Sequence, residues 1–351
     1  MTCARRAEKP LSSLRGIVDT ILVPHSAYSV ALHRMDQCLD YVKGGSGEPV
    51  CIAVMGESRT GKTRSIESFQ KKYPAIRFDD GLHVPLLSIT VPSRPTVKAL
   101  AELLLKKLGA TDWERGTENS KTARLEKLMK ECRVFMLVLD EFHHFYDKTS
   151  RKVQHHVADW LKNLVGACKV ALVVSGLPSL QAVIDQNEQL AGRFKSPILM
   201  PRFDWNLEEH RSEWTGILGA FSDGLRVNFD VPDLDGDNLS FRMYCATGGL
   251  IGYLTKTLRQ AVWNAVDTGT NVITIKDIEK AHCMALWSPE RFSEISNPFD
   301  LSRLVFPSHD VLAAARQIGT PITSEPEKPV RRGTGSPRGA ISGALIARGG
   351  S

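Results

Sequence analysis

A short segment with two fixed glycines, residues 56–63 (GESRTGKT), places the strongest constraint on the fold of this chain. It fits the pattern G-x-x-x-x-G-K-[ST] and lies between the apolar run CIAVM and a helix predicted from about Lys62. The glycines let the backbone curl so that its N–H groups and the N-terminus of the helix face an anionic group. The segment is therefore predicted to be a phosphate-binding loop rather than a chance turn.

The loop predicts both a nucleotide and a metal ion. Lys62 can reach the β and γ phosphates of ATP, and Thr63 can ligate Mg²⁺. ATP and Mg²⁺ are therefore the expected cofactors. The candidate nucleotide-binding residues of this segment are Gly56, Glu57, Ser58, Arg59, Thr60, Gly61, Lys62, Thr63 and Arg64.

Almost continuously apolar strands alternate with helices over residues 46–205. CIAVM is followed by VPLLSITV, VFMLVLD and KVALVVSG, with helical segments between these runs. Such strands are typical of a parallel sheet that helices cover on both faces. We expect an α/β fold with a P-loop core here, preceded by an N-terminal arm and helix over 1–45.

After Pro201 the strand pattern gives way to helical segments, so that 206–290 is predicted to be a small helical lid. Residues 291–351 are expected to be a linker and a disordered basic tail, because Gly, Ser, Pro and Arg dominate from about 317 onward. Seven residues carry the charge of the tail: Lys328, Arg331, Arg332, Arg338, Arg348, Glu325 and Glu327. Five cations and two anions give +3, half of the formal net charge of +6, which permits an anionic partner such as DNA.

The composition disfavours several other classes of protein. Apolar residues make up 42% and charged residues 24%, as in ordinary globular proteins. No apolar run reaches the roughly 18 to 20 residues that span a bilayer, and MTCARRAEKPLSS lacks the apolar centre of a signal peptide, so we expect no membrane partner and a cytoplasmic location. The seven cysteines form no CxxC pair, which argues against a disulfide framework or a zinc ribbon.

Two acidic residues end the strand VFMLVL and are expected at the carboxyl edge of the sheet, where ligands bind. An acidic pair there can be a solvated cap, but the upstream loop favours a catalytic role. Asp140 is a candidate Mg²⁺ ligand, together with Thr63, and Glu141 a candidate to polarise the attacking water. The neighbouring His143 and His144 fit no common zinc spacing and are interpreted as surface or packing residues near the nucleotide.

Several blocks of the sequence resemble the TniB/TnsC-type transposition regulators, a group of AAA+ ATPases that assemble on DNA and direct a transposase to its target. The resemblance covers about residues 20–285. Its blocks are GESRTGKT at 56–63, VPLLSITVPSRPTVKAL at 84–100, LDEFHHF at 139–145, VVSGLPSLQAVIDQNEQLAGRF at 173–194 and TGGLIGYLTKTLRQA at 247–261.

The resemblance implies an AAA+ ATPase that oligomerises on double-stranded DNA as a filament or ring, recruits or activates a transposase, and disassembles on hydrolysis. A transposase, a target-selection protein and further copies of the chain are the implied partners. By position, Arg193 is the candidate arginine finger that acts together with Glu141 and Lys62, and Ser175 the candidate sensor of the γ phosphate. The stretch implied to follow the DNA backbone offers Arg94, Lys98, Arg115, Thr117 and Lys121.

Two residues depart from the family pattern at sensor positions. Leu177 stands where Thr is common, and Tyr253 stands where Arg often follows I-G. Hydrolysis is therefore expected to be slow or differently triggered, and an ATP-gated scaffold that scarcely hydrolyses ATP is an alternative function. A small-molecule phosphotransferase shares the loop, but no residues stand out as its substrate pocket and acceptor base.

Overall fold

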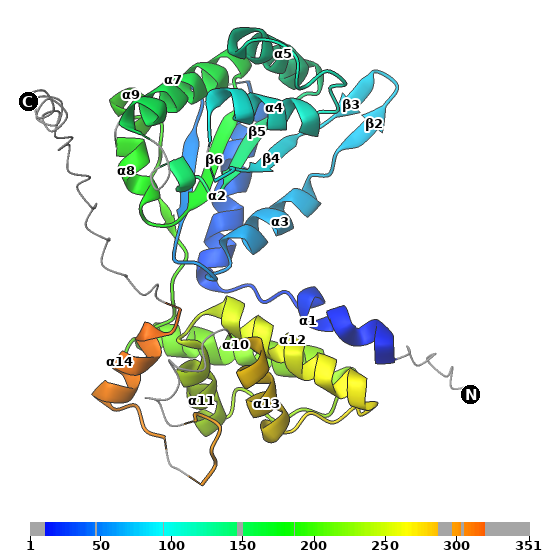
Figure 1. Ribbon diagram of the computed structural model, residues 1–351, viewed down its shortest axis with the longest axis vertical. Coiled ribbons are helices and arrows are strands. Elements are labelled where there is room, and N and C mark those ends of the chain that lie inside the picture. The colour runs from blue at the N-terminus through cyan, green and yellow to red at the C-terminus, as the bar shows by residue number, and fades with distance from the viewer. Residues whose placement is uncertain are drawn as a thin grey trace, which may run out of the picture. The chain divides into compact units, whose positions relative to one another are not determined.

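The computed structural model describes residues 11–45, 48–93, 95–145, 150–185, 187–286, 297–302 and 305–319 (Figure 1). Arg94, most of the predicted linker and the basic tail lie outside these residues. In the part of the chain that is described, no helix combines the length and apolar character needed to cross a membrane.

A five-stranded parallel sheet lies at the centre of the core. In sheet order its strands are β4 (Leu86–Thr90), β5 (Met136–Asp140), β6 (Ala171–Gly176), β1 (Cys51–Met55) and β7 (Ile198–Leu199). All four pairings are parallel, and β1, β5 and β6 are buried at every residue, as expected for strands covered on both faces. The predicted α/β fold with a parallel sheet flanked by helices is confirmed.

Helices cover both faces of the sheet (Figure 1), and alternate strand residues belong to the two apolar layers between sheet and helices. Side chains such as Ala53 and Leu137 pack with α4 (Val97–Lys107), α5 (Glu118–Glu131) and α7 (Arg151–Cys168). Their neighbours, such as Ile52 and Val138, pack with α2 (Ser26–Lys43) and α3 (Lys62–Lys72). This period of two follows from strand geometry and makes both faces apolar.

The register aligns the strand ends that carry the predicted site. Met55 pairs with Gly176, and Thr90 pairs with Asp140. The carboxyl ends of β1, β5 and β6 therefore meet at one edge of the sheet. Two short helices, α8 (Leu180–Asp185) and α9 (Glu188–Ala191), connect β6 to β7.

A small antiparallel hairpin that the sequence analysis did not foresee joins α3 to the sheet. It consists of β2 (Ile76–Phe78) and β3 (Gly81–His83). Gly81 has φ +136°, a conformation that favours glycine at the turn.

The residues after β7 form the expected helical region with its own apolar core. Its helices are α10 (Glu208–Arg226), α11 (Asp237–Thr247), α12 (Ile251–Thr268) and α13 (Ile275–Ala285). Leu14 of a 3-10 helix, η1 (Leu11–Gly16), and Val18 of α1 (Ile17–Thr20) are buried in the same core. The first part of the predicted N-terminal arm therefore packs with the lid helices.

Helix α14 (His309–Gln317) lies in the stretch predicted to be linker and tail, and the sequence analysis did not foresee it. The hydroxyl of Ser308 caps its N-terminus by accepting a hydrogen bond from the Val311 N–H. Leu312 and Ala315 are buried in the lid core, so this stretch continues the lid.

Two glycines that cap lid helices provide a matched test of this packing. Gly248 and Gly269 both have positive φ, +61° and +69°, but a Cβ on Gly248 would lie 2.5 Å from the Ala315 carbonyl oxygen, whereas a Cβ on Gly269 would meet nothing within 4 Å. We expect Gly269→Ala to lower the free energy of unfolding by about 1 kcal/mol, the cost of the left-handed conformation. Gly248→Ala should cost about 1–3 kcal/mol more, because the backbone of α14 has to shift.

Urea unfolding of both variants measures this difference. Equal losses would show that α14 does not approach Gly248 as closely as the structure has it.

Candidate nucleotide-binding site

The two fixed glycines of the loop are required for different reasons. Gly61 has φ +96° at the N-terminus of α3, a conformation that side chains rarely adopt. A Cβ on Gly56 would lie 2.5 Å from the carbonyl oxygen of Met200. Met200 is held there because its N–H donates to the carbonyl oxygen of Met55 in β1. One glycine therefore sets the backbone conformation, and the other allows the chain after β7 to approach the loop.

The Lys62 ammonium lies inside the loop. Its Nζ donates to the carbonyl oxygens of Gly56 at 2.9 Å and Glu57 at 2.7 Å, and the residue is 6% exposed. Burial lowers the pKa of Lys62, and the charges of Glu141, Asp140 and Glu57 oppose that shift. The lysine is thus held at the place where the loop curls, with acidic groups around it.

The predicted metal ligands are in direct contact. Thr63 Oγ1 donates to Asp140 Oδ2 at 2.8 Å, and Ser175 Oγ donates to Asp140 Oδ1 at 2.7 Å. The Glu141 N–H also donates to Asp140 Oδ1, at 2.9 Å. Hydroxyl and carboxylate oxygens are the ligands that Mg²⁺ prefers, so this group of residues fits the ion.

Glu141 occupies an uncommon backbone conformation beside two histidines. Its φ is +59°, a conformation that costs a non-glycine residue roughly 1–3 kcal/mol and is concentrated at functional sites. Its Oε2 lies 3.2 Å from Nδ1 of His143. The atoms of Glu141, His143 and His144 that could ligate a metal ion all lie within 4.8 Å of one another. His143 is buried against Gly176, where a Cβ would lie 3.1 Å from the His143 backbone nitrogen. The sequence analysis interpreted both histidines as surface or packing residues near the nucleotide and did not foresee the contact with Glu141.

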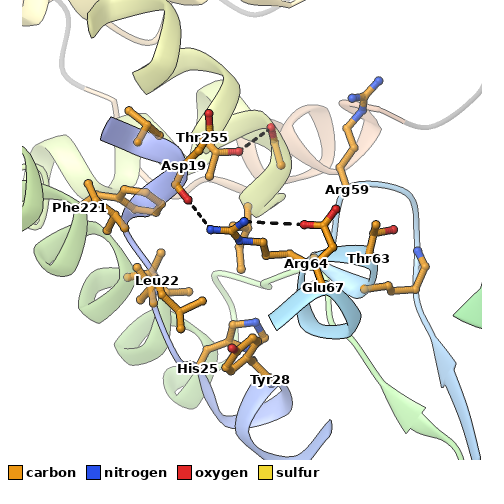
Figure 2. A pocket seen from close by; sticks show the side chains of 18 of the residues that line it. Asp19, Leu22, His25, Tyr28, Arg59, Thr63, Arg64, Glu67, Phe221 and Thr255 are labelled. Carbon is orange, nitrogen blue, oxygen red and sulfur yellow. Dashed lines mark hydrogen bonds and ion pairs between the residues drawn. The ribbon is translucent and has the colours of Figure 1, made fainter. Parts of the chain in front are cut away.

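A cavity of about 430 Å³ opens beside the loop (Figure 2). The loop residues Ser58, Arg59, Gly61, Lys62, Thr63 and Arg64 line it together with Glu141. The rest of the lining is mostly apolar or aromatic: Val18, Ile21, Leu22, Val23, His25, Tyr28, Ile217, Phe221 and Ile251. Asp19, Glu67, Thr255 and Arg259 also line it. A cavity of this size, lined by the phosphate loop and by many apolar side chains, fits a small organic anion with a flat ring.

The segment 18–28 is the part of the cavity that the sequence analysis missed. It carries no motif, and the one signal that could have found it is the apolar run ILV directly before Pro24. Within it, Asp19 holds two arginines: Arg64 donates to its carbonyl oxygen and Arg259 to its carboxylate (Figure 2 shows Asp19 with Arg64). Arg64 also lies 3.7 Å from Glu67.

The variable residues of the loop contact the residues after β7. Glu57 forms an ion pair with Arg202 at 2.7 Å. The Arg59 guanidinium lies over the ring of Tyr253, 4.6 Å from its centroid, and the Gly252 N–H donates to the Arg59 carbonyl oxygen at 2.9 Å. Tyr253, which departs from the family pattern, therefore has a cation from the loop on its ring.

Arg193 lies away from the cavity, at the amino end of β1. Its carbonyl oxygen accepts from the Cys51 N–H, and its Nη1 donates to the carbonyl oxygen of Lys162 in α7 at 2.9 Å. The five residues of β1 separate it from the loop by ~16 Å. Within one chain, Arg193 is therefore not part of the site that the loop, Asp140 and Glu141 form.

Three of the predicted DNA-contacting residues are exposed, and one is not. Lys98, Arg115 and Thr117 are exposed. Lys121 has no exposed side-chain surface: its Nζ donates to Glu102 Oε1 at 2.7 Å and to the carbonyl oxygens of Trp113 and Glu114. The prediction for Lys121 is corrected, because this ammonium holds α4, α5 and the loop between them together.

Comparison with solved structures supports the fold. A Cdc6p from Pyrobaculum aerophilum has a TM-score of 0.58 and 16% identity over 80% of this chain and 73% of its own. The Aeropyrum pernix ORC1 protein in complex with DNA has a TM-score of 0.55 and 15% identity over 80% and 71%. Drosophila ORC bound to DNA has a TM-score of 0.51 and 14% identity over 84% and 70%. At these identities the likeness shows that the chain has an AAA+ fold. No curated protein matches the sequence.

The family comparison gives a closer assignment. The family described as bacterial TniB protein matches residues 14–205, more than half of the 351 residues. This range holds the loop, Asp140, Glu141 and Ser175, and it begins before the segment 18–28 that lines the cavity. The chain belongs to the bacterial TniB family.

Proposed function

We propose that this protein is an ATP-dependent DNA-binding regulator of transposition. The observation that carries the proposal is that Lys62, Thr63 and Glu141 line one cavity, with Asp140 bound to Thr63, in a chain of the TniB family. The division into an arm (1–45), a core (46–205), a lid (206–290) and a linker with a basic tail (291–351) is part of the proposal, with α14 of the last stretch packed in the lid core.

ATP binds with its phosphates on the loop and its base against the apolar side chains of the cavity. Lys62 leaves the carbonyl oxygens of Gly56 and Glu57 to bind the β and γ phosphates, whose negative charge is a stronger partner. Thr63 and Asp140, which Ser175 orients, would hold Mg²⁺. Bound there, the ion would supply positive charge to balance that of the phosphates.

Hydrolysis uses Glu141 to polarise a water, because its carboxylate lines the cavity near the loop. The carboxylate must turn from His143 toward that water, since Nδ1 of His143 lies 3.2 Å from Oε2. We expect slow turnover, which suits a switch.

Assembly into a filament or ring depends on ATP through Arg193. A residue that acts in trans must lie away from its own loop, as Arg193 does. To reach the γ phosphate of a neighbouring copy, its guanidinium exchanges the Lys162 carbonyl oxygen for a charged acceptor.

DNA is bound through its backbone by Lys98, Arg115 and Thr117, with Arg94 from outside the described residues. The structures of Aeropyrum pernix ORC1 and Drosophila ORC, which share the fold, are both of complexes with DNA. Phosphate contacts of this kind tolerate sequence differences and weaken with salt. The assembled protein then recruits or activates a transposase, in the cytoplasm, with a target-selection protein directing it.

A second function, an ATP-gated adaptor that does not hydrolyse ATP, is favoured by one observation. The Ser175 hydroxyl, the candidate sensor of the γ phosphate, donates to Asp140 instead. Leu177 offers no polar group in its place.

Lys62→Ala and Glu141→Gln separate these functions. Lys62→Ala should weaken ATP binding about tenfold or more, because a charged hydrogen-bond donor to the phosphates is lost. It should also abolish ATP-dependent DNA binding in a gel shift. Glu141→Gln should keep ATP-dependent DNA binding and lose about 100-fold or more of single-turnover hydrolysis.

The two functions differ in one outcome of that experiment. Wild-type protein that binds ATP without detectable hydrolysis would leave only the adaptor, and hydrolysis that is unchanged in Glu141→Gln would show that Glu141 is not the catalytic base. DNA binding indifferent to both ATP and Lys62→Ala would contradict the regulator as well.

Lys98 and Lys121 provide a matched pair for the DNA surface. Lys98→Ala should reduce the slope of log K against log salt by about 0.9, one phosphate contact, with stability unchanged within about 0.5 kcal/mol. Lys121→Ala should lower the free energy of unfolding by about 2 kcal/mol, because two carbonyl oxygens and Glu102 lose their partner. Salt-dependent binding and urea unfolding measure the two effects. A normal stability of Lys121→Ala would show that its buried contacts are not formed.

A further inference from the structure

One guanidinium, that of Arg202, connects the phosphate loop with two helix ends. Its Nε and Nη2 donate to Oε2 of Glu57 at 2.9 and 2.7 Å. Its Nη1 donates to the carbonyl oxygens of Gly248 at 3.1 Å, Arg316 at 3.2 Å and Ile318 at 2.9 Å. The side chain of Arg202 is 11% exposed, so these contacts are largely shielded from water.

The three carbonyl oxygens belong to the C-terminal ends of helices. Gly248 is the C-cap of α11, and Arg316 and Ile318 lie at the end of α14. The last carbonyl groups of a helix have no partner within it and carry the negative end of the helix dipole. A guanidinium with five N–H donors satisfies several such groups at once. Arg202 therefore caps two helices while it holds a carboxylate of the loop.

The surroundings fix the position of Arg202. The nearby Met200 N–H donates to the Met55 carbonyl oxygen at 2.7 Å, which anchors this segment to β1 directly before the loop. On the other side, a Cβ on Gly248 would lie 3.0 Å from Nη1, so a larger residue there would push against the guanidinium. Arg316 also forms an ion pair with Asp204, which holds the end of α14 beside this segment.

Of the four residues whose oxygens accept hydrogen bonds from Arg202, Glu57 is the one that belongs to the phosphate loop. Its carbonyl oxygen accepts from Lys62 Nζ at 2.7 Å and from Thr60 Oγ1 at 2.9 Å. Glu57 is thus bound through its side chain to Arg202 and through its backbone to Thr60, which connects the position of α14 with the backbone of the phosphate loop. The contact with Thr60 remains when Lys62 turns to the phosphates.

We propose that Arg202 is a positioning residue that couples the phosphate loop to helix α14, so that nucleotide binding and the docking of α14 support one another. The proposal rests on the proposed binding of ATP by the loop. When α14 is docked, its carbonyl oxygens hold the Arg202 guanidinium, which in turn holds Glu57. The loop is then in its nucleotide-binding conformation in a larger fraction of the molecules. Because coupling is reciprocal, a loop fixed by ATP holds α14 more firmly.

The test compares two variants of the full chain with a matched control. Arg202→Gln removes the charge and most of the donors, and Glu57→Gln removes the loop's carboxylate and leaves the helix caps in place. Arg226→Gln is the control, because Arg226 pairs with Asp233 within the lid and does not line the cavity. Two quantities are measured: the Kd of a fluorescent ATP analogue with Mg²⁺, and amide hydrogen exchange over 309–317 with and without a non-hydrolysable ATP analogue.

We expect the wild-type protein to exchange more slowly over 309–317 when the analogue is bound. Arg202→Gln should weaken nucleotide binding about tenfold and abolish that difference in exchange. Glu57→Gln should also abolish the difference, while 309–317 keeps its basal protection because Arg202 still caps the helices. Arg226→Gln should behave as wild type.

Two results would overturn the coupling: nucleotide-dependent protection of 309–317 that persists in Glu57→Gln, or wild-type protein that binds the analogue with no change in exchange there. A wild-type protein that does not bind the analogue would overturn the proposed function together with the coupling. The measured Kd of the wild type distinguishes these cases.

Discussion

The carboxylate of Asp140 is the interaction on which the rest of the site depends. It accepts hydrogen bonds from Thr63 at the start of α3, from Ser175 at the end of β6 and from the Glu141 N–H. Three segments distant in sequence are thus held by one buried carboxylate at the edge of the sheet. The arrangement is possible because parallel strands bring their carboxyl ends to the same edge, and in an antiparallel sheet β5 and β6 would end on opposite sides.

Local sequence patterns predicted this edge of the sheet, because each pattern reflects a conformation that the backbone must adopt at that position. The two glycines of the loop, the apolar strands and the acidic pair Asp140–Glu141 each follow from neighbours in sequence, and the structure has them where they were expected. Lys121, the segment 18–28 and α14 were not predictable in the same way. Their environments are made by residues of other elements, which no local pattern identifies: Glu102 of α4 and two carbonyl oxygens of the loop between α4 and α5 bind Lys121, and the lid core buries Leu312. A charged or apolar residue in isolation carries no sign of such partners.

The variable positions of the loop show a related limit. The pattern G-x-x-x-x-G-K-[ST] describes phosphate binding only and leaves Glu57 and Arg59 free. In the structure these two side chains contact Arg202 and Tyr253, which lie after β7. Tyr253 looked like a lost cation when compared with the family pattern, but its ring is covered by the guanidinium of Arg59. The unusual residue Tyr253 is thus accompanied by a partner, Arg59, in the phosphate loop. A motif that covers only one of the two segments does not describe such a pair.

The charges around the cavity bear on why a metal ion should accompany the nucleotide. Four cations, Arg59, Lys62, Arg64 and Arg259, line it together with three anions, Asp19, Glu67 and Glu141. The Asp19 carboxylate already engages Arg259, Arg64 lies 3.7 Å from Glu67, and Asp140 lies behind Thr63. The side chains therefore leave little net positive charge for a triphosphate, so its binding has to draw on the backbone N–H groups at the start of α3 and on the charge of Mg²⁺. A metal ion held by the Thr63 hydroxyl and the Asp140 carboxylate would therefore serve to balance the charge of the triphosphate as well as to support hydrolysis.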